Sequence, residues 1–258
     1  MTLLTVTGLH KSFGGVVAAR DVSFTVARGE MLAIIGPNGA GKSTVFNMVG
    51  GQLGPDRGQV LIDGQDITHA SPQARFRGGV GRTFQVAQTF LSMSAAENVQ
   101  MALISRFRQS RGLWTPARER HRAGAVDLLA QVGMAEAADM PCSALAYGDV
   151  KRVELAIALA GQPKLLLMDE PTAGMAPQER AALMDLTASI AASQGIGVLF
   201  TEHDMDVVFG HAARVIVLLR GQIIAAGTPD EIRQDPQVRR AYLGDSHALE
   251  PSQGTGPA

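Results

Sequence analysis

Continuous apolar runs alternate along the chain with stretches that have helical spacing. Such runs are typical of strands that are covered on both faces, so they predict the buried strands of a sheet. The predicted strands of this kind lie at 31–35, 164–168, 196–201 and 214–219, the last pairing with 222–225 as a hairpin around Gly221.

The first part of the chain has a different pattern. Residues 4–9 and 22–26 carry apolar side chains mainly at alternate positions, which predicts half-buried strands. Residues 59–62 and the Asp63-Gly64 turn resemble a hairpin, and 81–85 is expected to end a further short strand. The sequence therefore predicts an antiparallel β portion before the main alternation of strands and helices.

Helices are predicted between these strands. Ser94 and Glu97 form the pattern of a capping box, and Thr228 with Glu231 repeats it near the C-terminus. The predicted helices are 42–49, 95–107, 117–132, a helix following 145–149, 177–193 and a last stretch from 228 to 243. Strands that alternate with helices indicate a mostly parallel sheet.

The domain organisation follows from where this alternation breaks. A helical block at about 86–160 interrupts the α/β pattern, and we interpret it as a subdomain inserted into the core. Residues 245–258 are polar and rich in Gly, Pro and Ser, so we expect a disordered tail after a domain at 3–244.

Composition excludes several classes of protein. With 46% hydrophobic residues, the 258-residue chain can bury a sizeable core, and a net charge of −1 gives no indication of nucleic-acid binding. Cys142 is the single cysteine, which fits a reducing compartment. No leader-like segment opens the sequence, and no apolar run approaches the ~20 residues of a membrane helix. We therefore expect a soluble chain whose membrane role, if any, comes through partners.

One stretch carries the strongest chemical signal. It fits G-x-x-x-x-G-K-[ST], the phosphate-binding P-loop, and lies between a predicted strand and a predicted helix. Its residues are Gly36, Pro37, Asn38, Gly39, Ala40, Gly41, Lys42, Ser43 and Thr44. Backbone N–H groups and the helix dipole can hold an anion here. Lys42 is then expected to reach the β- and γ-phosphates of a nucleotide, and the Ser43 hydroxyl to ligate Mg²⁺.

Two carboxylates follow the apolar run 164–168. Asp169 is expected to hold Mg²⁺ directly or through water, and Glu170 to polarise the attacking water. Gln85 and His203 are each ambiguous alone, but both follow short strands, as Lys42 and Glu170 do. Because ligands bind at the carboxyl edge of parallel sheets, these side chains can meet at one site.

On these residues, the chain resembles the nucleotide-binding subunits of ABC transporters over about 3–244. Gly36–Thr44 looks like their Walker A motif and Leu165–Glu170 like their Walker B motif with its catalytic glutamate. In the same comparison Gln85 resembles the Q-loop glutamine, with roles in catalysis and metal binding, and His203 the switch histidine. Composition alone favours a core role for Phe13, but the resemblance makes it the adenine-stacking aromatic. The fold it implies is a P-loop (RecA-like) α/β core with an inserted helical subdomain.

Two segments depart from the family pattern. The signature motif, usually Leu-Ser-Gly-Gly-Gln, is Leu145 followed by Ala146, Tyr147, Gly148 and Asp149. These four residues are expected to contact the nucleotide of an opposing subunit, with Ala146 lacking the usual hydroxyl. The D-loop reads Thr172-Ala-Gly-Met175 where Ser-Ala-Leu-Asp is usual, so its aspartate is missing.

The Ala-Tyr-Gly string and Glu202-His203-Asp204-Met205 are similar to those of bacterial branched-chain amino-acid uptake ATPases. This implies an ATPase using ATP and Mg²⁺, a head-to-tail dimer with a second ATPase subunit, either the same or different, and two membrane-spanning permease subunits. A periplasmic solute-binding protein would act indirectly, and no nucleic acid would be involved. The chain itself would lie peripherally at the cytoplasmic face of the bacterial inner membrane. Other cargoes remain open: urea, amides, aromatic acids or lipid export. Outside transport, the alternative is a soluble ABC-type ATPase acting on ribosomes or DNA.

The segment from Arg75 to Arg122 is strongly basic. It holds nine arginines and two acids, a net +7 in a chain of net −1. One interpretation is a solvated helical face. The other is a membrane-facing side, because the resemblance places the coupling helices of the membrane subunits there. On the second interpretation Arg106, Arg108, Arg111 and Trp114 lie away from the nucleotide.

Overall fold

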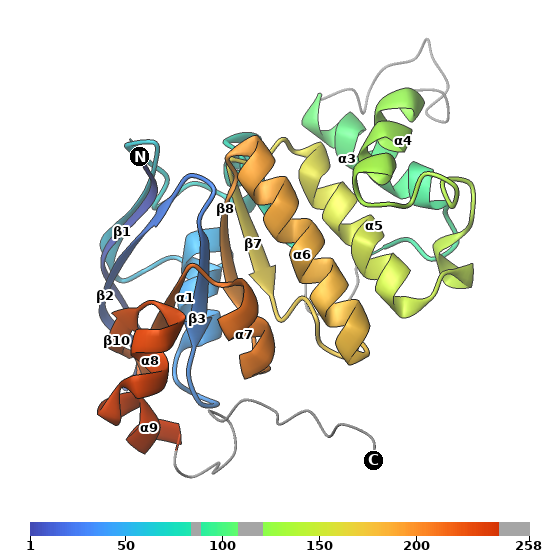
Figure 1. Cartoon of the computed structure of the whole chain (residues 1–258). Coiled ribbons are helices and arrows are strands. Elements are labelled where there is room, and N and C mark those ends of the chain that lie inside the picture. The colour runs from blue at the N-terminus through green and yellow to red at the C-terminus, as the bar shows by residue number, and fades with distance from the viewer. Residues whose placement is uncertain (84–88, 108–120, 243–258) are drawn as a thin grey trace, which may run out of the picture.

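A six-stranded sheet runs through the centre of the structure, in the order β10-β9-β3-β8-β7-β6 (Figure 1). The computed structural model describes residues 1–83, 89–107 and 121–242. Neighbouring strands from β9 to β6 are parallel, and β10 is antiparallel to β9. The strands are β3 (Met31–Ile35), β6 (Val80–Thr83), β7 (Leu165–Asp169), β8 (Gly197–Thr201), β9 (Arg214–Leu219) and β10 (Gln222–Gly227).

A second, antiparallel sheet comes from the first part of the chain. Its order is β2-β1-β4-β5. The strands are β1 (Thr2–Phe13), β2 (Val16–Ala27), β4 (Arg57–Ile62) and β5 (Gln65–Asp66). Register shifts between β1 and β2 mark bulges or other irregularities in these long strands. The predicted N-terminal antiparallel portion is therefore confirmed.

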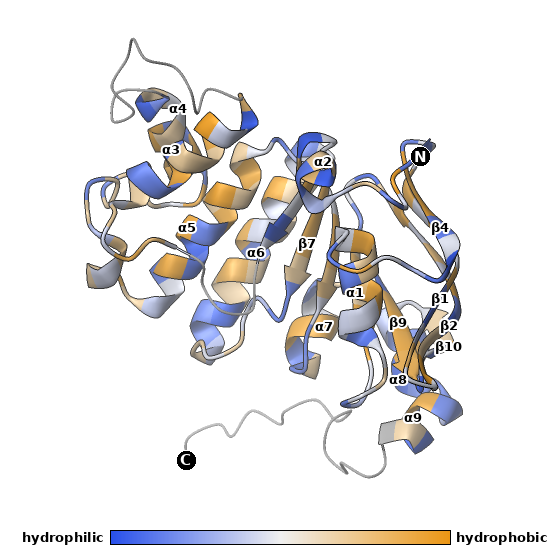
Figure 2. Ribbon diagram, turned by 180° about the vertical axis from the view of Figure 1, so that it is seen from behind, coloured by the Kyte–Doolittle hydropathy of each residue, from blue (hydrophilic) through white to orange (hydrophobic). Residues whose placement is uncertain are grey.

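The central strands alternate between two hydrophobic cores. Leu32 and Ile34 of β3 face a core shared with α1 (Lys42–Gly50) and the antiparallel sheet. Met31, Ala33 and Ile35 of the same strand face the core on the other side. Burial on both faces explains why these strands are continuous apolar runs, and Figure 2 shows β7 and β9 as apolar strands among the helices.

Helices cover the second face and extend from it. Figure 1 shows α6, α5 and then α3 with α4 in succession on the side away from β1 and β2. The remaining helices are α2 (Pro72–Arg77), α3 (Ala95–Arg106), α4 (Arg122–Gln131), η1 (Cys142–Ala144), α5 (Tyr147–Ala160), α6 (Pro177–Gln194), α7 (Met205–His211), α8 (Pro229–Gln234) and α9 (Pro236–Tyr242). Apolar residues of α3, α4 and α5 join the core on that face, and the boundaries predicted for a helical subdomain, about 86–160, stay a prediction.

Most predicted elements are present with small changes at their ends, and the α/β fold with a mostly parallel sheet is confirmed. The last helical stretch was expected to be continuous but is broken at Asp235, because a residue before proline avoids the helical conformation. The sequence interpretation missed α2 and α7, although Ser71 followed by Pro72 and the capping Asp204 were usable signals. No helix in the described ranges is long and apolar enough to cross a bilayer.

The basic segment does not behave as one surface. Arg75 is 1% exposed and donates to the carbonyl oxygens of Thr68 at 2.7 Å and Met48 at 2.7 Å. It also donates to Val49 and Ala70, so it ties α2 to the last turn of α1. Arg106 donates to the carbonyl of Ala160 and to Gln162. The other three residues of the membrane-facing prediction, Arg108, Arg111 and Trp114, lie outside the described residues, as does the predicted tail at 245–258.

Replacing Arg75 with methionine should lower the free energy of unfolding by about 2–4 kcal/mol, because buried carbonyl oxygens lose a charged donor. Arg77 lies on the same short helix but is exposed, so Arg77→Met should change stability by less than about 0.5 kcal/mol. Chemical denaturation of the two variants measures the difference. Equal stability of the two would show that Arg75 does not hold α1 in place.

Candidate nucleotide-binding site

The loop between β3 and α1 is shaped by glycines. Gly41, the N-cap of α1, has φ 103°, a conformation that side chains rarely adopt. A Cβ added there would lie 2.3 Å from the carbonyl oxygen of Ala18 in β2. The loop is further fixed by Gly221, whose N–H donates to the Ala40 carbonyl at 2.8 Å. The antiparallel sheet and the β9–β10 turn therefore support the loop from behind, leaving the start of α1 to face an anion.

Lys42 lies over this loop and is 8% exposed. Its Nζ donates to the carbonyl of Gly36 at 2.6 Å and of Pro37 at 3.2 Å. Burial lowers the pKa of Lys42, and the charges of Glu170 and Asp169 oppose that shift. The ammonium thus lies within electrostatic reach of both carboxylates.

Asp169 ends β7, and Glu170 follows it with a backbone φ of 47°. A positive φ is unusual for a residue with a side chain and costs of order 1–3 kcal/mol, so neighbouring contacts must hold it. The Glu170 N–H donates to the carbonyl oxygen of Thr201 at 3.1 Å. Asp169 accepts a hydrogen bond from the Thr201 hydroxyl at 2.7 Å, and its other oxygen lies 3.5 Å from Arg82.

His203 reaches back to the same carboxylate. Its Nε2 lies 2.8 Å from Oε1 of Glu170, while 51% of its side chain is exposed. The imidazole can therefore orient the Glu170 carboxylate and remains open to a ligand. The structure brings Lys42, Asp169, Glu170 and His203 to one edge of the parallel sheet.

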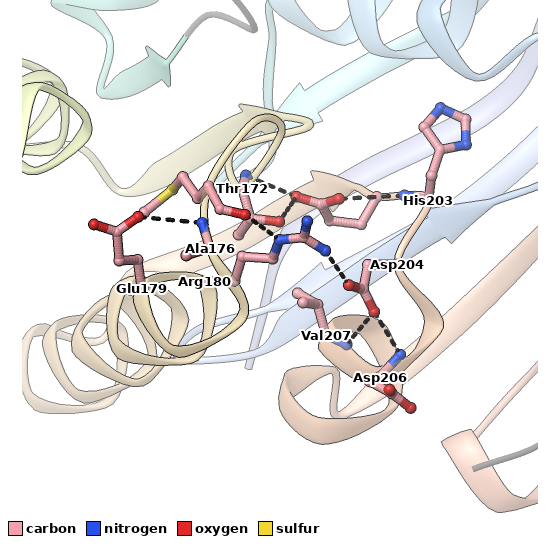
Figure 3. A network of polar contacts seen from close by, with 10 residues as sticks. Thr172, Ala176, Glu179, Arg180, His203, Asp204, Asp206 and Val207 are labelled. Atoms are coloured by element: carbon pink, nitrogen blue, oxygen red, sulfur yellow. Dashed lines mark hydrogen bonds and ion pairs between the residues drawn. The ribbon is translucent and has the colours of Figure 1, made fainter. Parts of the chain in front are cut away.

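Two side-chain links, one from the loop after β7 and one from the first turn of α6, reach the loop after β8 (Figure 3). The buried carboxylate of Glu202 accepts from the N–H of Thr172 at 2.8 Å and from its hydroxyl at 2.7 Å. Arg180 donates both to the Met175 carbonyl and to Asp204, which in turn caps α7. The segment carrying Glu170 and the segment carrying His203 are thus fastened together beyond the sheet.

The other predicted site residues that the structure describes lie at the end of β1 and at the start of α5. Phe13 is 50% exposed at the end of β1, with the Lys11 ammonium 5.7 Å from its ring centroid. Ala146 is the N-cap residue of α5 but offers no side-chain cap, Tyr147 is exposed, and Asp149 lies in the first turn. Gly148 is buried in that turn, where an added Cβ would lie 3.1 Å from the Glu179 carboxylate. Gln85 lies outside the described residues, so its predicted roles stay predictions.

Sequence reasoning missed Thr201, Arg82, Glu202 and Arg180. Thr201 and Arg82 read only as polar members of strands, and their partners are far away in sequence. Charge pairing across two loops has no local pattern. Only the strand register and the loop packing identify these residues.

The residues present fit a magnesium ion bound with a nucleotide. Ser43 is exposed in the first turn of α1, and the side chain of Asp169 keeps 19% of its surface exposed. Oxygen donors of this kind suit Mg²⁺, which commonly takes one or two carboxylates and completes its shell with phosphates and water. The described residues contain no cluster of three or more His, Cys, Asp or Glu side chains that could hold a metal ion.

A strand, glycine loop and helix with Lys42, facing two carboxylates across a parallel sheet, define a P-loop nucleotide-binding protein. Residues 19–173 match the family model described as ABC transporter, and 222–248 match the one described as branched-chain amino acid ATP-binding cassette transporter. The chain belongs to the family of ABC transporter ATP-binding proteins. It is an ATPase of that family, as the motifs predicted.

Individual relatives align with nearly the whole chain. The chain is 39% identical to the high-affinity branched-chain amino acid transport ATP-binding protein LivG of Escherichia coli (strain K12), covering 95% of this chain and 98% of LivG. It is also 39% identical to the lipopolysaccharide export system ATP-binding protein LptB of Acidithiobacillus ferridurans, covering 96% of this chain and 99% of LptB.

Solved structures support the fold. The ADP conformation of MJ1267, an ATP-binding cassette of an ABC transporter, superposes with a TM-score of 0.85 at 33% identity, covering 95% of this chain and 100% of that one. The post-hydrolysis cassette MJ0796, described as dimeric and bound to ADP and Pi, has a TM-score of 0.74 at 26% identity, covering 88% and 99%.

The start of α6, which follows the loop after β7, offers a test of helix capping next to the site. Ala176 is the N-cap residue and has no side-chain acceptor, although Glu179 accepts from its N–H at 3.2 Å. Ala176→Asp should raise the free energy of unfolding by about 1 kcal/mol, because the new carboxylate caps free N–H groups. Ala182→Asp is the control on the same helix, at an exposed interior position where aspartate disfavours the helix. A destabilised Ala176→Asp variant would contradict the prediction.

Proposed function

We propose that the chain is the ATP-hydrolysing subunit of a bacterial importer for branched-chain amino acids, working at the cytoplasmic face of the inner membrane. The observation that carries the proposal is the meeting of Lys42, Asp169, Glu170 and His203 in a chain 39% identical to LivG. The match of residues 222–248 to a branched-chain family model supports the cargo.

The geometry supports a division of roles in hydrolysis. The loop Gly36–Thr44 would bind the phosphates through its N–H groups, and Lys42 would exchange its two carbonyl partners for phosphate oxygens. Glu170 would accept a proton from the attacking water, with His203 fixing its carboxylate. A magnesium ion would be held by Ser43, Asp169 and Gln85 and would neutralise phosphate charge.

A head-to-tail dimer would complete the site. In it, the nucleotide lies between the glycine loop of one chain and residues 146–149 of the other, with Phe13 against the adenine. The N-terminal end of α5 and the exposed Tyr147 provide a surface for such a contact, and MJ0796 is dimeric. We expect a heterodimer with a second ATPase subunit, and a homodimer is the alternative.

The partners in the membrane would be two permease subunits, with a periplasmic solute-binding protein acting through them. An apolar pocket of about 240 Å³ between α2, β6, α3 and α5 suits apolar side chains that project from a helical segment of a permease. Phe76, Val80, Ala102 and Ile157 contribute to its walls. A neighbouring pocket of about 350 Å³ shares Phe76 and Ala102. Arg77, exposed on α2, borders the second pocket, which favours an acidic or polar-ended segment.

Lipid export is the second candidate function, because LptB shares the same 39% identity as LivG. Purifying the tagged chain with its membrane subunits and reconstituting the complex in liposomes tests both. The import proposal predicts uptake of leucine, isoleucine or valine that depends on ATP and on the solute-binding protein. A complex whose ATP hydrolysis is instead stimulated only by lipopolysaccharide would support export.

Glu170→Gln should lower ATP turnover by roughly 10²–10⁴-fold while nucleotide binding persists, because only the base is lost. Phosphate release measures turnover, and gel filtration with ATP should show a trapped dimer. The exposed Glu136→Gln variant serves as the control and should retain turnover. Wild-type turnover in Glu170→Gln would show that another group is the base.

Ala102→Glu should block assembly with the permease, because it places a charge in the apolar pocket. The same replacement at Ala130, an exposed residue of α4, is the matched control. Copurification with the membrane subunits measures assembly, and ATP binding by the isolated chain should be unchanged in both. If Ala102→Glu assembles as well as the control, the permease docks elsewhere.

A further inference from the structure

One buried hydroxyl touches both carboxylate residues of the site. Thr201 ends β8 and is 1% exposed. Its Oγ1 donates to Oδ1 of Asp169 at 2.7 Å and accepts from the N–H of Glu170 at 3.2 Å. Its carbonyl oxygen accepts from that same N–H at 3.1 Å. Thr201 therefore fixes the side chain of one residue and the backbone of the next.

The second oxygen of Asp169 has its own neighbour. Oδ2 lies 3.5 Å from Nη2 of Arg82, a residue that is anchored by Gln52 at 2.6 Å and Asn47 at 2.9 Å. This guanidinium also lies 5.1 Å from the centroid of the Phe46 ring. Oδ1 accepts a close hydrogen bond from the hydroxyl, whereas Oδ2 has only a longer ionic contact. Oδ2 is therefore the oxygen that can more easily exchange its partner for a cation.

We propose that Thr201 is a positioning residue that sets the affinity of the site for magnesium, an inference that rests on the proposed magnesium role of Asp169. Its hydroxyl holds the carboxylate in one orientation before the cation arrives. The same hydroxyl stabilises the strained backbone of Glu170, so the metal ligand and the base keep a fixed relation. Outer groups that orient metal ligands typically change metal affinity by 10–100-fold when removed.

Because Thr201 makes contacts through its hydroxyl and through its backbone carbonyl, different replacements should have different effects. Valine has nearly the same shape as threonine but lacks the hydroxyl, so it removes both hydroxyl contacts and leaves the carbonyl contact to Glu170. Serine keeps the hydroxyl. Thr187 in α6 is equally buried at 1%, and its hydroxyl donates to the Leu183 carbonyl at 2.8 Å, so Thr187→Val is a matched control away from the site.

The experiment titrates Mg²⁺ into the full-length chain with a fluorescent ATP analogue and records the Mg²⁺ concentration at half-maximal change. Binding of the analogue in EDTA supplies the metal-free baseline. Thr201→Val should raise the Mg²⁺ midpoint by about 10–100-fold with little change in the baseline. Thr201→Ser should restore most of the wild-type midpoint, and Thr187→Val should match wild type. Electron paramagnetic resonance with Mn²⁺ in place of Mg²⁺ gives a second readout.

Asp169→Asn separates the possible failures. If Asp169→Asn shifts the midpoint and Thr201→Val does not, the role of Thr201 is overturned while the magnesium site stands. If Asp169→Asn also keeps the wild-type midpoint, the magnesium assignment fails and the role of Thr201 fails with it. Should Thr201→Val not fold, as judged by thermal unfolding beside Thr187→Val, the pair Thr201→Ala and Thr201→Ser makes the same comparison.

Discussion

The register between β7 and β8 is the constraint on which the candidate site depends. These two central strands are parallel, and Asp169 is paired with Thr201 at their carboxyl ends. Because side chains alternate along a strand, a slip of one residue would turn Asp169 to the opposite face of the sheet. The apolar residues on both faces, in contact with two separate cores, make such a slip costly. The core thereby fixes the position of the polar residues that follow it.

From the last residue of β8 onward, each of four consecutive residues contacts the chain that runs from the end of β7 into α6. Thr201 contacts Asp169 and Glu170, Glu202 contacts Thr172, His203 contacts Glu170, and Asp204 pairs with Arg180. The hydrogen bonds of Glu170 to Thr201 and His203 hold it at its positive φ, a conformation that a residue with a side chain usually avoids. The loops are therefore an extension of the strand pairing, built from side chains instead of backbone.

The parts of the fold that sequence could predict are those with a local cause. Apolar runs located the central strands, the capping residues located α3 and α8, and the glycine motif located the loop that leads into Lys42 and α1. The carboxylates Asp169 and Glu170 could be predicted from the sequence because they directly follow an apolar run that ends at a sheet edge. The role of Thr201 could not be predicted, since it depends on which strand lies beside β8. Arg75 was misjudged with the other arginines of its segment, because burial of a charge against carbonyl oxygens has no signature in composition.

The position of Arg75 also has an electrostatic consequence for the opposite end of α1. This helix has nine residues, so it is about 13 Å long, and its amino end faces the glycine loop. Its carboxyl end carries the negative pole of the helix dipole, and the Arg75 guanidinium binds two carbonyls there. A cation fixed at that pole offsets the charge that would repel an incoming anion. Residues buried well behind the glycine loop thus contribute to how strongly its front attracts a phosphate, and a search for phosphate-binding variants confined to residues that touch the ligand would overlook them.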